Sequence, residues 1–199
     1  MILAPSLDWV DEVMQNFDLD SYYSEIVDLI KSEEVYKKLN DAKKLVLDTK
    51  NADGKLILFG NGAGSGIASH AAVDFTKQAD VKALTLHDTG LITALSNDFG
   101  YDNWCKKAFE FFASQNDVLV CISVSGESPN LVTVARYAKN KGHKIISLTG
   151  RHENNSLGQL ADVHFHVQSH AYNIVEGILM IWLTSIVDMI RGEAVYEVS

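Results

Sequence analysis

One stretch of the sequence, residues 117–140, reads DVLVCISVSGESPNLVTVARYAKN and decides the fold. It begins with a continuous apolar run of strand length, residues 117–123, and passes through a short polar loop into a helix expected over 129–140. Continuous apolar runs that are followed by crossover helices are typical of parallel sheets buried on both faces. The stretch therefore predicts a strand, loop and helix of an α/β protein.

The same alternation of strand and helix recurs on both sides of this unit. Short apolar runs of strand length stand at 55–60, 81–86, 143–150 and 162–167. Helical stretches are expected between them at about 66–78, 90–97 and 102–114, and a long apolar helix closes the chain. This order predicts a doubly wound α/β fold, with a parallel sheet flanked by helices.

The part of the chain before the first strand has a different pattern. Over residues 5–50, apolar side chains recur at three- and four-residue steps, which predicts an N-terminal helical extension. No linker or repeat divides the chain. We therefore expect one domain over 1–199, in which about 1–50 form the extension and 51–199 form the α/β core with the C-terminal helix.

Composition and charge exclude several classes of protein. Apolar residues make up 47% of the 199 residues, a globular composition. The chain has 17 Lys and Arg against 26 Asp and Glu, a net charge of −9, which disfavours direct binding of nucleic acid. Cys105 and Cys121 lie in apolar stretches and predict buried thiols, as in a reducing cytoplasm. The first 14 residues lack the basic residues of a signal peptide, so we expect a cytoplasmic protein.

The last apolar stretch, residues 174–190, approaches the length of a membrane span. It contains Glu176 near its start and Asp188 near its end. A helix that is apolar all round inside a soluble protein is usually buried in a core or in an oligomer interface. We therefore expect no membrane association.

A glycine-rich turn, GNGAGSG at residues 60–66, follows the first predicted strand. Its glycines let the backbone approach a ligand closely, and the following helix offers unpaired amides. The spacing fits neither the dinucleotide fingerprint nor the P-loop, so NAD and ATP are disfavoured. Candidate substrate contacts here are Asn61, Gly62 and Ser65. The alternative is a structural turn without a ligand.

A second loop supplies three hydroxyl groups within six residues, from Ser123, Ser125 and Ser128. Pro129 is well placed to begin a helix whose amides face the same point. Neutral hydroxyls beside a helix N-terminus suit a phosphate monoester, because they bind the dianion without requiring a basic protein. One serine could instead cap the helix, but three exceed what a single cap needs.

The third polar segment, HDTGLITALSNDFGYDN at residues 87–103, is rich in short polar side chains. Asp88, Asn97 and Asp98 are the candidates for hydrogen bonds to sugar hydroxyls. Helix caps and turns use the same residue types, so both interpretations stay open.

Taken together, the Gly60-Asn61-Gly62 turn, the serine loop, SNDFGYDN and KIISLTG resemble the sugar isomerase (SIS) domain family. The similarity is to its phosphoheptose isomerase branch, whose members convert sedoheptulose 7-phosphate to glycero-manno-heptose 7-phosphate. The resemblance implies a homotetramer in which the N-terminal and C-terminal helices pack between subunits. It also implies that sites combine residues of more than one subunit.

The resemblance also implies acid–base groups and a zinc ion, and here the sequence departs from the family. The first pair of family ligands, His and Glu, corresponds to His70 and Asp74. The second pair, Gln and His of the last helix, corresponds to Val175 and Leu183, which cannot bind a metal. The zinc set is therefore incomplete, and we expect no metal or other cofactor. Glu176 matches a glutamate of these isomerases and is either a base or a carboxylate that stabilises the helix start.

Two main functions follow from these residues. The first is a sedoheptulose 7-phosphate isomerase with an altered site, in which Asp74, Glu176 or His70 transfers the proton. The second is a non-catalytic SIS tetramer, similar to the initiator-associating protein that binds the replication initiator protein. An acidic chain suits contact with a protein on DNA rather than with DNA itself. Sensing of a sugar phosphate is a third possibility that shares the serine loop.

Overall fold

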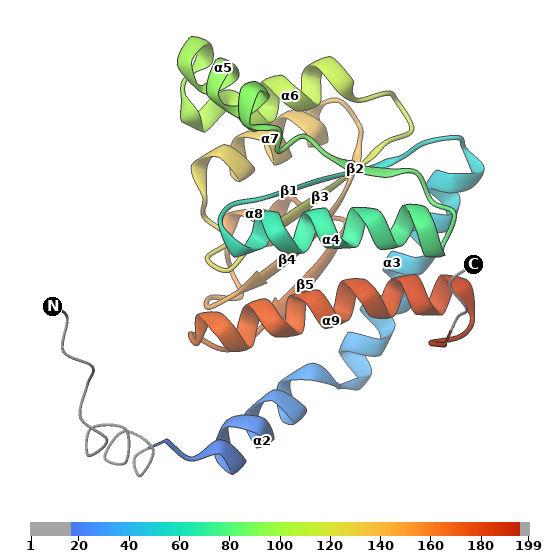
Figure 1. The fold of residues 1–199 in the computed structure, drawn as a ribbon, viewed down its shortest axis with the longest axis vertical. Coiled ribbons are helices and arrows are strands. Elements are labelled where there is room, and N and C mark those ends of the chain that lie inside the picture. Colours follow the sequence, from blue (N-terminus) through green and yellow to red (C-terminus); the bar gives the residue numbers. More distant parts are fainter. Residues whose placement is uncertain (1–16, 196–199) are drawn as a thin grey trace, which may run out of the picture.

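A computed structural model describes residues 17–195, and a five-stranded parallel sheet of order β2-β1-β3-β4-β5 forms its centre (Figure 1). Every neighbouring pair of strands is parallel. The strands are β1 Leu56–Gly60, β2 Ala83–Thr85, β3 Val118–Ser123, β4 Lys144–Gly150 and β5 Val163–Val167. This confirms the doubly wound parallel sheet predicted from the sequence.

Helices cover both faces of this sheet. Within the described residues, two helices precede the first strand, α2 Leu19–Ile30 and α3 Glu33–Asn51. The remaining helices are α4 Ala63–Gln78, α5 Thr89–Phe99, the 3-10 turn η1 Tyr101–Asn103, α6 Trp104–Phe112, α7 Pro129–Asn140, α8 Ser156–Leu160 and α9 Tyr172–Arg191. Side chains of α3, α4 and α9 form the core on one face, and those of α5, α6, α7 and α8 form it on the other.

The strand β1 shows how the sequence builds these two cores. Its residues are all buried, because helices lie on both sides of the sheet. Leu56 and Leu58 face the core that contains α4 and α9, whereas Ile57 and Phe59 face the core that contains α6 and α7. Alternation of apolar side chains between two cores explains why the run is continuously apolar rather than alternating with polar residues.

The strand order creates a switch point between β1 and β3. From β1 the chain passes through α4 to the edge strand β2, and then returns to add β3 on the other side of β1. The helices that follow these two central strands, α4 and α7, therefore lie on opposite faces of the sheet. In such folds a crevice opens beyond the carboxyl ends of the two strands.

The N-terminal extension is helical but is not one helix. The sequence pattern predicts a helical extension over 5–50, and within the described residues the structure has α2 and α3 separated by Lys31 and Ser32. The hydroxyl of Ser32 accepts a hydrogen bond from the backbone N–H of Val35 at 3.1 Å and so caps α3. Residues 1–16 of the predicted extension lie outside the described residues.

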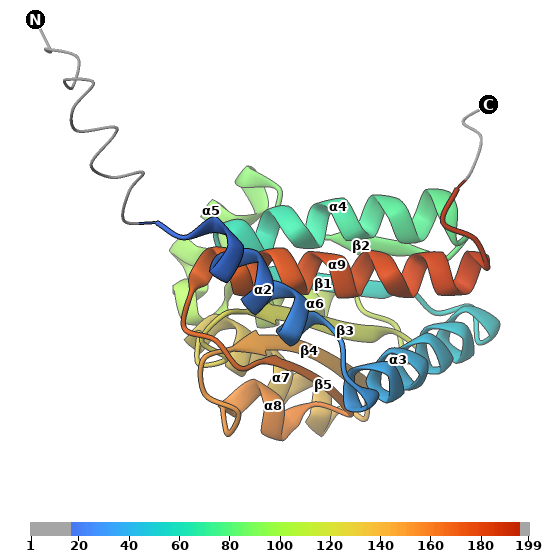
Figure 2. The ribbon, with the colours of Figure 1, turned by 90° about the horizontal axis from the view of Figure 1, so that it is seen from below.

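The closing helix α9 is the longest helix of the described residues, and its inner face lies in the core. Within residues 17–195 it is the one helix that is long and apolar enough to cross a membrane. Ile174, Leu179 and Trp182 are nevertheless buried against the sheet and its neighbouring helices. The indole N–H of Trp182 also donates to the carbonyl of Ile30 at 2.9 Å, where α2 lies across α9 (Figure 2).

The two cysteines confirm the expected buried thiols. Cys105 of α6 and Cys121 of β3 are both free and buried. Burial in apolar surroundings raises the pKa of both thiols far above the ordinary value, because a thiolate would be poorly solvated there. Neither thiol is therefore suited to act as a nucleophile.

Candidate functional site

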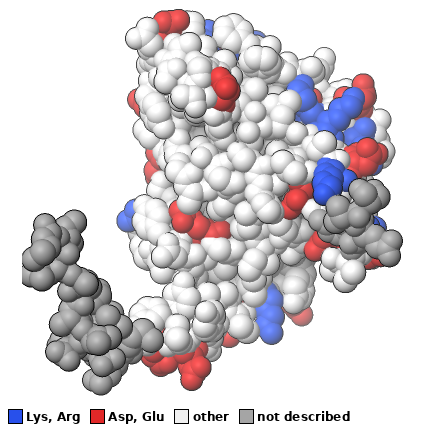
Figure 3. Space-filling model, in the orientation of Figure 1, with Lys and Arg blue, Asp and Glu red and all other residues white. Residues whose placement is uncertain are grey.

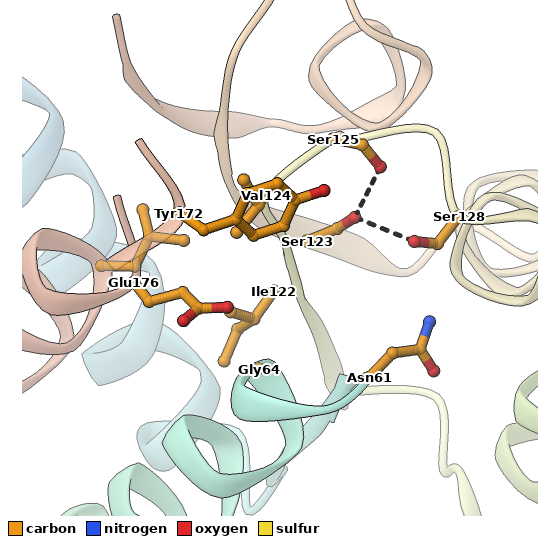
Figure 4. A pocket seen from close by; sticks show the side chains of 10 residues that line it. Asn61, Gly64, Ile122, Ser123, Val124, Ser125, Ser128, Tyr172 and Glu176 are labelled. Carbon is orange, nitrogen blue, oxygen red and sulfur yellow. Dashed lines mark hydrogen bonds between the residues drawn. The ribbon is translucent and has the colours of Figure 1, made fainter. Parts of the chain in front are cut away.

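A pocket lies at the switch point between β1 and β3, with α9 along one side (Figure 4). Three segments that are distant in sequence form its wall. They are the start of α4 with Asn61 and Gly64, the end of β3 and the following loop with Ile122, Ser123, Val124, Ser125 and Ser128, and α9 with Tyr172, Glu176 and Leu179.

The three serines of the predicted phosphate loop converge in this pocket. The Ser123 hydroxyl oxygen lies 3.4 Å from that of Ser125 and 3.1 Å from that of Ser128. Ser128 is the N-cap of α7 through its backbone, but its hydroxyl makes no capping bond. The hydroxyl of Ser128 is thus directed to Ser123, and the helix-cap alternative does not account for it.

The serine loop is held from behind by α8, which the sequence pattern did not reveal. Gly126 has a φ of +67°, and a Cβ at this position would stand 2.2 Å from Asn155, the buried N-cap of α8. The Glu127 carboxylate accepts hydrogen bonds from the backbone N–H and the hydroxyl of Ser156, each at 2.7 Å. These bonds lower the pKa of Glu127 and direct its negative charge to α8.

Three helices begin at the pocket. Gly64 lies in the first turn of α4, Ser128 is the N-cap of α7, and Tyr172 is the first residue of α9. None of these three helices has a side-chain hydrogen bond from its N-cap, so their first amides are not capped in that way. Lys and Arg are absent from the residues that line this pocket. The positive ends of helix dipoles, together with hydroxyls, therefore provide the attraction for an anion.

The glycine-rich turn contributes Asn61 to the pocket but not its other two predicted contacts. The Asn61 side chain pairs with that of Asn130 and accepts a hydrogen bond from the Tyr101 hydroxyl at 3.2 Å. Gly62 is the N-cap of α4 with a φ of +54°, and the Ser65 hydroxyl donates to the Gly62 carbonyl at 2.7 Å. Gly62 and Ser65 thus shape the helix start without lining the pocket.

Of the three candidate catalytic residues, the structure brings only Glu176 to the serine loop. Glu176 lies in the second turn of α9 and lines the pocket opposite the serines (Figure 4). His70 and Asp74 lie farther along α4, where His70 Nε2 is 3.0 Å from Asp74 Oδ2. Asp74 also accepts a hydrogen bond from Gln78 at 2.8 Å, and neither His70 nor Asp74 lines the pocket.

The polar residues of the segment 87–103 behave as caps and turns. Asp88 is the N-cap of α5, and its carboxylate accepts from the backbone N–H of Leu91 at 3.0 Å. The Asn97 side-chain amide donates to the Asp98 carboxylate at 2.9 Å. None of these three candidates lines the pocket at the switch point.

The donor set does not fit a zinc ion of the kind that the resemblance implies. Val175 and Leu183 are buried apolar side chains, and Val175 packs against Gly150 at the end of β4. Within the described residues, no group of three or more His, Cys, Asp or Glu side chains is arranged to hold a metal. His164 of β5 is engaged with the Thr149 hydroxyl at 2.7 Å.

Sequence reasoning missed two wall residues of α9, Tyr172 and Leu179. Both were detectable, because they lie four residues before and three residues after Glu176. Side chains at this spacing share one face of a helix. Once Glu176 is a candidate, the spacing alone therefore indicates the other two.

Comparison with known proteins agrees with this geometry. Residues 21–150 match one family model of the SIS domain, and residues 111–197 match a second. The phosphoheptose isomerase of Aliarcobacter butzleri is 34% identical over 145 residues, which cover 69% of this chain and 76% of that protein. The phosphoheptose isomerase of Sodalis glossinidius is 31% identical over 160 residues, covering 78% and 82%. The solved phosphoheptose isomerase of Neisseria gonorrhoeae superposes with a TM-score of 0.79 at 27% identity, covering 86% of this chain and 97% of that one.

Proposed function

Because the chain belongs to the SIS domain family, in its phosphoheptose isomerase branch, we propose that it isomerises a phosphorylated ketose to the aldose. The substrate we infer is sedoheptulose 7-phosphate, and the product glycero-manno-heptose 7-phosphate. The observation that carries the proposal is the meeting of three serine hydroxyls and one carboxylate, Glu176, in a single pocket at the switch point.

The serine loop binds the phosphate group in this proposal. Hydroxyls of Ser123, Ser125 and Ser128 rotate to donate to phosphate oxygens, and the N-terminus of α7 adds backbone amides. Neutral donors are well suited to a chain with a net charge of −9, because they need no basic residue in the pocket. The carboxylate of Glu127, which would repel a phosphate, is bonded to Ser156 instead.

Glu176 transfers the proton in this proposal. As base it takes a proton from C1 of the ketose, which gives an enediol, and as acid it returns a proton to C2. The accompanying change moves a proton from the oxygen on C1 to the oxygen on C2. Tyr172, one turn earlier on the same helix face, brings a hydroxyl that can donate a hydrogen bond to the carbonyl oxygen.

The decisive experiment follows the conversion of sedoheptulose 7-phosphate by NMR, with binding measured separately by calorimetry. The variant Glu176→Gln keeps the size of the side chain, and we expect it to retain binding but to lose turnover by about 100-fold or more. Its control is Asp188→Asn, a carboxylate on the same helix that does not line the pocket. Failure of the unmodified protein to bind would overturn the proposal. Unchanged turnover in Glu176→Gln would remove Glu176 from the mechanism.

Self-association is part of the proposal, because the helices offer an uncharged surface. On α4 and α9, Val73 and Ile181 are exposed by 60% and 43%, and Leu19, Tyr23 and Val27 form an exposed apolar stripe on α2. The face that carries α4 and α9 is largely uncharged (Figure 3). We infer a homotetramer that buries these surfaces and brings His70 and Asp74 to a neighbouring subunit. Light scattering tests this, and Val73→Glu with Ile181→Glu should yield smaller species.

A second candidate function is a non-catalytic SIS tetramer that binds the replication initiator protein. The observation in its favour is the loss of acid–base and metal side chains at Val175 and Leu183, together with the position of His70 and Asp74 outside the pocket. Under this function the pocket binds a phosphorylated sugar without turning it over. Absence of turnover, with and without added zinc, together with capture of the purified initiator protein, would favour it. The buried free thiols suit a cytoplasmic setting for either function.

A further inference from the structure

The side chain of Asn61 is fixed by a reciprocal pair of hydrogen bonds with Asn130. Asn61 Nδ2 donates to Asn130 Oδ1 at 3.0 Å, and Asn130 Nδ2 donates to Asn61 Oδ1 at 2.9 Å. Asn130 is the second residue of α7 and is only 1% exposed. The pair joins the turn after β1 to the helix after β3, so it spans the switch point.

Two further contacts complete this network. The Tyr101 hydroxyl donates to Asn61 Oδ1 at 3.2 Å, and Asn130 Nδ2 also lies 3.4 Å from the Cys105 sulfur. A side-chain amide has two N–H donors and one oxygen acceptor. Both N–H donors of Asn130 are therefore engaged. The Asn61 oxygen accepts two hydrogen bonds, and one of the two Asn61 N–H groups has no partner among these contacts.

The remaining N–H of Asn61 is well placed for a ligand. Asn61 lines the pocket, and its amide nitrogen lies on the side of Ser128 (Figure 4). An asparagine free to rotate would offer either its oxygen or its nitrogen to the pocket. The amide oxygen would repel a phosphate or carbonyl oxygen, and the network removes that orientation because Asn130 and Tyr101 hold the oxygen.

We propose that Asn130 and Tyr101 are positioning residues that present Asn61 as a single N–H donor to an oxygen of the bound sugar phosphate. The inference rests on the proposed function, because it takes the same pocket to bind that ligand. It also connects the segment 87–103 to the pocket through Tyr101, whereas Asp88, Asn97 and Asp98 do not line the pocket. Tyr101 acts from this segment through Asn61 rather than by touching the ligand.

A double-mutant cycle tests the proposal, with calorimetric binding of sedoheptulose 7-phosphate as the readout. We expect Asn61→Ala to weaken binding by about 10-fold and Tyr101→Phe by about threefold, since each removes one hydrogen bond. In the Asn61→Ala background, Tyr101→Phe should not weaken binding further, because the side chain that the Tyr101 hydroxyl orients is no longer present. Tyr36→Phe, an exposed tyrosine of α3, is the matched control and should bind as the unmodified protein does.

The variant Asn130→Ala extends the cycle to the buried partner without adding a charge. It removes both bonds of the pair, so binding should weaken while Asn61 is present and change little in the Asn61→Ala background. If this variant does not fold, Tyr101→Phe carries the test alone. Equal losses with and without Asn61 would overturn the inference, as would no loss in Tyr101→Phe. If the unmodified protein did not bind sedoheptulose 7-phosphate at all, the proposed function would be overturned as well. This outcome differs from equal losses of affinity with and without Asn61, which would overturn only the positioning role.

Discussion

The serine loop at 123–128 and the segment at 87–103 look alike in sequence but differ in the structure. Both follow a strand and both are rich in short polar side chains, but the serine loop precedes α7 whereas the segment 87–103 includes α5. The three hydroxyls of the serine loop converge on one point of the pocket. In the other segment, Asp88 caps α5 and Asn97 bonds to Asp98.

Their places in the sheet explain the difference. The serine loop follows β3, which lies between β1 and β4, so neighbouring segments enclose it on two sides. The segment 87–103 follows the edge strand β2, which pairs with β1 alone. Polar groups beside the switch point can be directed into a crevice, whereas those beyond an edge strand satisfy their own helix ends. Position in the sheet thus separates the two segments where composition does not.

The largest effect should come from filling the space behind the serine loop with Gly126→Ala. The new Cβ would stand 2.2 Å from Asn155, and the residue would keep a φ of +67°. We expect a loss of about 2–4 kcal/mol in the free energy of unfolding and loss of sugar phosphate binding. Chemical denaturation and calorimetry measure both.

The matched control for this change is Gly142→Ala, in the turn before β4. Gly142 has a φ of +83° but open space around its Cβ position, so only the backbone strain remains. The expected loss is about 1 kcal/mol, with binding unchanged. Equal losses in the two variants would show that contact with Asn155 does not support the loop.

The second prediction compares one residue from each segment. Ser128→Ala should weaken binding of the sugar phosphate by about 10- to 100-fold, because a hydrogen bond to a charged group is lost. Asp88→Ala should leave binding within about twofold and lower the free energy of unfolding by about 1 kcal/mol, because a helix cap is lost. If Asp88→Ala weakened binding as much as Ser128→Ala, the contrast between the segments would be wrong.

The third prediction concerns the support behind the serine loop at low pH. The Thr149 hydroxyl accepts from Asn155 at 2.9 Å and lies 2.7 Å from His164 Nε2, to which it can donate only while that nitrogen is unprotonated. Burial lowers the pKa of His164 to about 4 from 6.5. The stabilisation is present above pH 6.5 and is lost as the pH falls towards 4, because the unfolded chain takes up the proton first.

Between pH 7 and pH 5 we expect protonation of this histidine to lower the free energy of unfolding by about 1 kcal/mol, less than the full shift implies because solvent screens the partly exposed ring. His164→Gln keeps a hydrogen-bonding side chain without the titration, so its stability should fall less over the same interval. Parallel denaturation curves at the two pH values measure the difference. Identical pH dependence in both proteins would contradict the assignment.

The smallest effect should come from Asn97→Ala in the segment 87–103. This exposed side chain bonds only to its neighbour Asp98 among the contacts described for it. We expect binding to change by less than about twofold and the free energy of unfolding by less than about 0.5 kcal/mol. A clear loss of affinity would indicate that Asn97 contacts the sugar phosphate.

The sequence was sufficient to predict the strands and α7, because continuous apolar runs and Pro129 mark them locally. It did not predict α8, since the five residues SLGQL are too few to show a period. It also did not predict the break at Lys31 and Ser32, because the apolar pattern continues across it.

The site was predicted unevenly for a related reason. Hydroxyls and glycines after a central strand indicated the serine loop, and Glu176 was named because it matches a glutamate of the isomerases that the chain resembles. Asp88, Asn97 and Asp98 were named as contacts because caps and ligand-binding residues share their chemistry. The roles of Tyr101 and Asn130 depend on contacts over 40 and 69 residues of sequence, which no local pattern records.

The order in which the chain leaves the ribosome gives the last helix a particular importance. The pocket needs Tyr172, Glu176 and Leu179, and the N-terminal helix α2 is fastened through Trp182 to a carbonyl 152 residues earlier. A nascent chain can therefore pair its strands and close the serine loop while α2 still lacks its contact with Trp182. Synthesis of α9 completes both the pocket and this contact with α2, so translation products that end before α9 should be unable to retain a sugar phosphate.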